Sequence, residues 1–146
     1  RSAEQFAKMG EKCKENGLQL GYHNHAFEFE KLDGRYILDL LFEAVPADLF
    51  AAELDLYWVK KAGLDPKAYM QQYKGRTPII HLKDMTSDGR EFFAEVGQGL
   101  IDFPSILEAA PDNGVRYYIV EQDQCERPPL ESVKISIEYL KSLGVA

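Results

Sequence analysis

Phe50-Ala51-Ala52-Glu53-Leu54-Asp55-Leu56-Tyr57 is the segment from which the fold can be predicted most directly. The stretch begins with apolar residues and carries the acidic Glu53 and Asp55 in its second half, and its length and composition predict a strand. Asp65-Pro66 follows it and marks the start of a helix, because Asp is a good N-cap and Pro is favoured at the first helical position. The same order of strand and helix recurs on both sides of this stretch, which predicts an α/β fold.

Three further segments read as strands of the same kind: residues 18–23, 78–82 and 117–121. Strands that alternate with helices predict a parallel sheet with right-handed crossovers. No linker rich in Pro, Gly or Ser divides the chain, so we expect residues 1–146 to form a single unit. Five helices are expected: from Ser2 as N-cap to Gly17, over residues 37–42, from Asp65 to Gly75, from Asp102 or Pro104 onward, and from Pro128-Pro129 to Gly144. Asp33-Gly34 is expected to form a turn, and residues 91–96 a short extra strand.

The composition limits the classes of partner. The 146 residues are 45% hydrophobic and carry a net charge of -7, which indicates a globular domain and argues against a nucleic-acid partner. No apolar run approaches the roughly 20 residues of a membrane helix, so no membrane partner is expected. The chain has no initiator Met, so we expect a processed or excised piece whose N-terminus gives no localisation. Cys13 and Cys125 form no motif and are interpreted as ordinary thiols.

Polar side chains collect where each predicted strand ends. In a strand, residues i and i+2 share a face, and the carboxyl ends of parallel strands meet at one rim, where the active sites of such folds lie. Two imidazoles and two carboxylates at this rim would form a mixed nitrogen and oxygen site, which suits Mn, Co, Zn or Fe(II) better than Mg. One charged residue at a strand end is usually a loop residue or a cap, but four strands in succession favour a shared site. The four ends are 23–25, 53–55, 81–84 and 121–123.

Individual residues at the rim allow different interpretations. Asp55 and Glu121 each follow an apolar strand body and are the strongest candidates, whereas Glu53 lies one pleat earlier and is expected to be structural. Asp84 is interpreted as a cap of the following segment. Lys83 is either a solvated charge or a group that acts as an acid or base or polarises a carbonyl.

Further candidates lie beyond the strands. His25 is a candidate substrate contact, and Trp58 is either a packing aromatic or a wall for a sugar ring. Gly97-Gln98-Gly99 indicates a tight turn, because no dinucleotide fingerprint surrounds it. The sequence also contains no Walker loop and no nucleophile elbow.

Five motifs occur in order along the chain: residues 22–29 (YHNHAFEF), 53–58 (ELDLYW), 81–84 (HLKD), 97–103 (GQGLIDF) and 121–123 (EQD). Together they resemble the sugar phosphate isomerase/epimerase family, which belongs to the xylose-isomerase-like TIM barrels. The resemblance covers nearly the whole chain and is more specific for the superfamily than for a substrate. It implies the C-terminal half, four β/α units, of a (β/α)8 barrel, and therefore a partner for the open sheet: the missing N-terminal half or a second copy in a homodimer.

The resemblance also implies a divalent metal, with Mn, Co, Zn or Mg as candidates. In the family, Glu, Asp, His and Glu from the last four strands hold it, which implies Asp55, His81 and Glu121 as ligands here. The first position departs from the family pattern, because His23 stands where the family has Glu. We expect His23 to replace that ligand; the alternatives are Glu28 reaching in from the following segment, or three protein ligands.

The implied activity is that of a metal-dependent sugar isomerase or epimerase, which removes the proton α to the carbonyl of a keto sugar or related polyol. His25, Lys83 and Glu121 are the expected catalytic groups, and Trp58, His25 and Lys83 the expected substrate contacts. The alternatives are a dehydratase or lyase that acts on a keto sugar or inosose with the same site, and a non-catalytic sugar-binding barrel. An endonuclease IV-like phosphodiesterase is disfavoured by the three histidines and the charge of -7.

Overall fold

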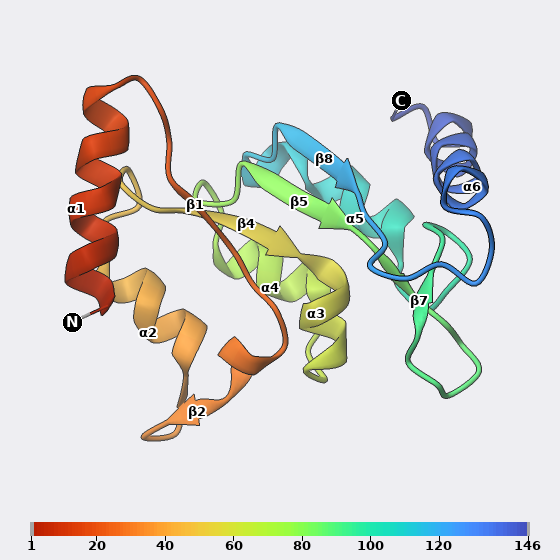
Figure 1. Cartoon of the computed structure of the whole chain (residues 1–146), viewed down its shortest axis with the longest axis horizontal. Coiled ribbons are helices and arrows are strands. Elements are labelled where there is room, and N and C mark those ends of the chain that lie inside the picture. Colours follow the sequence, from red (N-terminus) through yellow and green to blue (C-terminus); the bar gives the residue numbers. More distant parts are fainter. Residues whose placement is uncertain (1, 146) are drawn as a thin grey trace.

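A four-stranded parallel sheet forms the centre of the protein in the computed structural model, which describes residues 2–145 (Figure 1). The strands lie in chain order, β1-β4-β5-β8, and each pairs in parallel with its neighbour. The register places Asp55 of β4 opposite His81 of β5, so two of the predicted site residues are direct neighbours. The strands are β1 (Gly21–His23), β4 (Ala51–Asp55), β5 (Ile79–Leu82) and β8 (Tyr117–Val120).

One face of the sheet is buried and the other is open. Leu54 and Ile80 point to the covered face and are 1% and 0% exposed. Tyr117 and Ile119 of β8 point the other way and are 57% and 41% exposed. The helices between and around the strands are α1 (Ser2–Glu15), α2 (Ile37–Ala44), α3 (Leu56–Lys61), α4 (Pro66–Gln72), α5 (Phe103–Ala109) and α6 (Pro129–Ser142), with short 3-10 turns η1 (Phe27–Phe29) and η2 (Pro111–Asn113).

Two small hairpins extend from this framework. β2 (Lys31–Leu32) pairs with β3 (Arg35–Tyr36) around the predicted turn at Asp33-Gly34, where both residues have positive φ. β6 (Asp84–Met85) pairs with β7 (Phe93–Ala94), which confirms a strand within residues 91–96. Within residues 2–145, no helix combines the length and apolar character that crossing a membrane requires.

Three predicted boundaries were wrong. The strand expected over residues 50–57 ends at Asp55, because its side chain accepts hydrogen bonds from the amides of Tyr57 and Trp58 and starts α3 there. β1 is shorter than predicted and begins at Gly21, where pairing with β4 begins. Ser2 is the first residue of α1 rather than its N-cap. The α/β class and the four β/α units are confirmed.

Candidate metal centre

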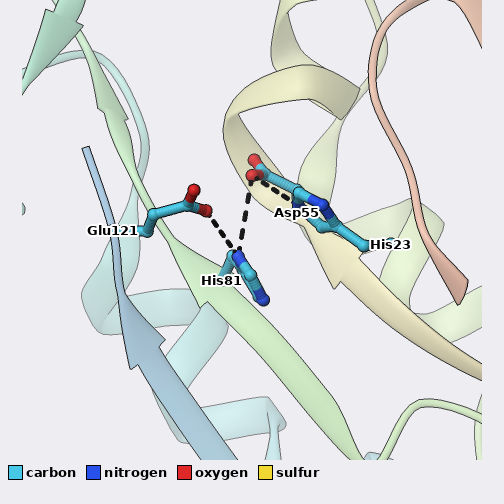
Figure 2. A group of neighbouring side chains, drawn as sticks. All are labelled: His23, Asp55, His81 and Glu121. Carbon is cyan, nitrogen blue, oxygen red and sulfur yellow. Dashed lines mark hydrogen bonds and ion pairs between the residues drawn. The ribbon is translucent and has the colours of Figure 1, made fainter. Parts of the chain in front are cut away.

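Four side chains from the ends of four neighbouring strands converge at the carboxyl edge of the sheet (Figure 2). They are His23, Asp55, His81 and Glu121, and each offers a ligand atom within 4.8 Å of the others. Nε2 of His23 lies 3.1 Å from Oδ2 of Asp55, and Nδ1 of His81 lies 2.6 Å from Oε2 of Glu121. The structure therefore brings together the four residues that the sequence proposed as metal ligands.

The two carboxylate oxygens of Asp55 have different partners: one caps a helix and the other faces the cluster. Oδ1 caps α3 by accepting hydrogen bonds from the amides of Tyr57 and Trp58, at 3.0 and 3.2 Å. Oδ2 faces the cluster. The side chain of Asn24 fixes the position of Asp55 from the next strand, because its Oδ1 accepts a hydrogen bond from the Asp55 amide at 2.9 Å. Sequence reasoning missed this role of Asn24, which depends on the side chain reaching across to the next strand.

Lys83 lies at the cluster and is fully buried. Its Nζ is 2.9 Å from Oδ2 of Asp55, 3.1 Å from Oε2 of Glu121 and 2.6 Å from Oδ2 of Asp123. Burial alone would lower the pKa of Lys83, but the three carboxylates outweigh it and raise that pKa above its usual value. The interpretation of Lys83 as a solvated charge is therefore wrong.

Contacts within the cluster also shift the pKa values of Glu121 and His23. Burial would raise the pKa of Glu121, but hydrogen bonds with His81 and Lys83 lower it overall. The hydrogen bond with Asp55 is the main cause that raises the pKa of His23. The donor set of two imidazoles and two carboxylates is that of a site for a first-row divalent ion, so these four residues could hold one.

Comparison with known proteins agrees with the fold and the motif order. Residues 1–143 match the model of the family described as xylose isomerase-like TIM barrel. The chain belongs to this family. As a member of the xylose isomerase-like TIM barrels, it supplies four of the eight β/α units of the barrel, and its strand ends lie at the rim where such barrels carry their active sites.

The chain is similar to proteins described as an inosose dehydratase, a rhizopine catabolism protein and a sugar phosphate isomerase/epimerase. Inosose dehydratase of Lacticaseibacillus casei is 27% identical over 96% of this chain and 53% of the relative. The rhizopine catabolism protein MocC of Rhizobium meliloti is 28% identical over 94% of this chain and 47% of that protein. A crystal structure of a sugar phosphate isomerase/epimerase from Parabacteroides distasonis superposes with a TM-score of 0.86 at 29% identity, over 97% of this chain and 53% of the other. The chain thus spans about half the length of the relatives it matches.

Glu28 does not belong to the cluster of this xylose isomerase-like barrel. It is buried beneath the loop after β1, where its carboxylate accepts hydrogen bonds from the hydroxyl of Tyr22 and the amide of His25, each at 2.8 Å. Burial and this hydrogen bond raise the pKa of Tyr22 to about 12. Glu28 therefore shapes the loop that carries His25, whereas His23 lies among the four residues that could hold an ion.

An aromatic group borders the cluster on one side. The ring of His25 lies 5.0 Å from that of His23, 5.3 Å from that of Trp58 and 5.8 Å from the nearly parallel ring of Phe27, between centroids. Within residues 2–145, no hydrogen bond satisfies the buried Nε1 of Trp58. His25 and Trp58, the two expected substrate contacts beyond the strands, thus lie beside each other and next to the cluster.

Asp84 organises the loop that contains the two glycines. Its fully buried carboxylate accepts hydrogen bonds from the amides of Met85, Gly97, Gly99 and Ile101, at 2.8 to 3.0 Å. A Cβ at Gly99 would lie 2.4 Å from Oδ1 of Asp84, so only glycine fits there. The predicted capping role of Asp84 is confirmed and extends to a loop far along the chain, which the sequence did not indicate.

Proposed function

We propose that the protein is a divalent-metal-dependent enzyme that removes the proton α to the carbonyl of a keto sugar or a related cyclic polyol ketone. The observation that carries the proposal is the convergence of His23, Asp55, His81 and Glu121, whose ligand atoms lie within 4.8 Å of one another at the catalytic rim of the fold. A divalent ion held by these residues would supply Lewis-acid polarisation of a carbonyl oxygen and so acidify the neighbouring C–H bond.

His25 is the proposed base. Its ring borders the cluster, and within residues 2–145 its ring nitrogens form no hydrogen bond, so one of them is available to take the proton from substrate. Glu121 has a side chain that is 36% exposed, whereas that of Asp55 is fully buried. Glu121 can therefore face a bound substrate as well as hold the ion.

Lys83 and Trp58 have supporting roles in this proposal. The buried ammonium of Lys83 compensates the carboxylates of Asp55, Glu121 and Asp123, which would otherwise repel one another. Its predicted contact with substrate would require a shift of these ion pairs. Trp58 offers a ring face beside His25, and such a face suits the C–H surface of a sugar ring.

Two outcomes follow from the same proton abstraction. Return of the proton to another position gives isomerisation or epimerisation, and loss of a β-hydroxyl gives dehydration. The likeness to inosose dehydratases, at 27% identity, supports dehydration, and the likeness to the Parabacteroides distasonis sugar phosphate isomerase/epimerase, at 29%, supports isomerisation. The proposal therefore commits to the shared first step.

Exchange of hydrogen with solvent tests that step. The full-length protein, loaded with Mn²⁺, is incubated in D₂O with an inosose or a ketohexose, and the substrate is then freed of metal and examined by NMR. We expect deuterium at the carbon α to the carbonyl, and none after chelation of the metal. A protein that binds metal and keto sugar but neither exchanges nor converts it would be a sugar-binding barrel, and the proposed activity would be wrong.

A further inference from the structure

Glu53 contacts His81 from the side of the ring opposite to the cluster. Its Oε1 lies 2.8 Å from Nε2 of His81, while Nδ1 of the same ring lies 2.6 Å from Oε2 of Glu121 and 4.0 Å from Oδ2 of Asp55. One nitrogen of the ring thus faces the other candidate ligands, and the second nitrogen faces Glu53. The imidazole is held between two carboxylates with different surroundings.

Both ring nitrogens of His81 lie within hydrogen-bond distance of a carboxylate, and an ion at the cluster would decide which of them carries the proton. An ionised carboxylate only accepts hydrogen bonds, so without a metal either Nδ1 can donate to Glu121 or Nε2 can donate to Glu53. An ion bound by Nδ1 leaves Nε2 as the nitrogen that carries the proton, and Glu53 accepts its hydrogen bond. A neutral imidazole carries one proton, and the nitrogen that ligates a metal must be the other one. Nδ1 then presents its lone pair toward Asp55 and Glu121, which is the direction that a shared ion requires.

The neighbouring strand leaves room for the carboxylate of Glu53. Gly21 lies opposite Ala51 in the sheet, two residues before the partner of Glu53, and a Cβ on Gly21 would lie 3.2 Å from Oε2 of Glu53. The side chain of Glu53 is 30% exposed and points to the open face of the sheet, so it is not part of the packed core. Its contact with His81 is therefore the interaction that distinguishes it from a packing residue.

We propose that Glu53 is a positioning residue for the metal centre, which holds the proton of His81 on Nε2 and thereby directs Nδ1 to the ion. This inference rests on the proposed function, because it needs a metal at the cluster. Carboxylates that orient metal-binding histidines in this way change metal affinity by about 10- to 100-fold when removed.

Two variants separate a hydrogen bond from a charge. Glu53→Gln keeps an oxygen that can accept from Nε2 but loses the charge, and Glu53→Leu loses both. Glu108→Leu, at an exposed glutamate of α5, controls for the loss of an acidic residue elsewhere. The affinity for Mn²⁺ alone is measured on full-length protein by the EPR signal of the free ion, together with the melting temperature of each metal-free variant.

We expect Glu53→Leu to bind Mn²⁺ about 10- to 100-fold more weakly, and Glu53→Gln and Glu108→Leu to bind it nearly as the wild type does. Equal affinity of Glu53→Leu and wild type would overturn the inference, and equal weakening in both Glu53 variants would replace it by a charge effect. If the wild type itself binds no Mn²⁺, the proposed function fails instead.

An NMR measurement on the wild-type protein tests the same inference if Glu53→Leu does not fold. In wild-type protein labelled with ¹⁵N-histidine and loaded with Zn²⁺, the shifts of His81 report which ring nitrogen carries the proton. We expect the proton on Nε2. A proton on Nδ1 would contradict the inference whatever the variants show.

Discussion

Nζ of Lys83 lies 2.9 Å from Oδ2 of Asp55, and neither side chain is exposed to solvent. A buried ion pair adds little net stability, because desolvation offsets much of the attraction, but removing one partner leaves an uncompensated charge. The ammonium of Lys83 also forms ion pairs with Glu121 and Asp123. The stability of the metal-free protein should therefore depend on Lys83.

Lys83→Met should lower the free energy of unfolding of the metal-free protein by about 3–5 kcal/mol. Added Mn²⁺ should recover more stability in this variant than in wild type, because the ion brings positive charge to the same carboxylates. Urea unfolding with and without Mn²⁺ measures both effects. Lys61→Met is the control: Lys61 forms a partly exposed ion pair with Glu91 at 2.9 Å and should cost less than about 1 kcal/mol. A Lys83 variant as stable as this control would contradict the prediction.

His81→Ala and Glu121→Gln should each reduce turnover by at least about 100-fold while the fold persists, because both residues lie at the rim and are proposed to hold the ion. Steady-state rates at ordinary metal concentration measure the loss of turnover, and far-UV circular dichroism shows whether the fold persists. Turnover that survives both substitutions would show that the reaction does not use the cluster.

His25→Asn should separate proton transfer from metal binding. The ring of His25 borders the cluster but is not among the four candidate ligands. We expect turnover to fall by about 10²- to 10⁴-fold, the usual loss for a general base, and the affinity for Mn²⁺ to stay unchanged. A parallel loss of metal affinity would instead identify His25 as a ligand, and unchanged turnover would exclude it as the base.

The 146-residue chain alone should not behave as a stable monomer. β1 and β8 are open edges of the sheet, and Tyr117 and Ile119 are 57% and 41% exposed on its uncovered face. Burial of each large apolar side chain contributes about 1.5 to 3 kcal/mol. We expect pairing with a second copy, as a two-fold dimer, or with an N-terminal half-barrel. Sedimentation at micromolar concentration tests this, and a monomer with a sharp, cooperative melt would contradict it.

The positions of the site residues could be predicted from the sequence where a simple rule relates a residue's place in a strand to the direction of its side chain. Alternation along a strand and the shared rim of parallel strands were sufficient to bring Asp55 and Glu121 together with the two histidines. The same rule placed Leu54 within a strand but not on the covered face, because the direction of the helices decides which face is buried. The choice of His23 over Glu28 as a ligand came from a motif comparison and stays a prediction; in the structure, His23 lies within the cluster and Glu28 outside it.

Side-chain contacts between segments that are far apart in the chain could not be predicted from the sequence. Glu53 was expected to be structural, because nothing in its own strand shows that the ring of His81 lies 2.8 Å away. The burial of Lys83 depends on the carboxylate of Asp123, 40 positions further along the chain. Such contacts follow from strand order and register, which a single sequence does not specify at the level of side chains.

A crystal structure of the full-length protein at saturating Mn²⁺ would show, through the anomalous scattering of the ion, whether the four residues at the strand ends bind a metal. We expect one strong peak at the strand ends, within about 2.0 to 2.3 Å of atoms of His23, Asp55, His81 and Glu121. A peak bound only by other residues, or any of these four side chains turned to the helix-covered side of its strand, would contradict it.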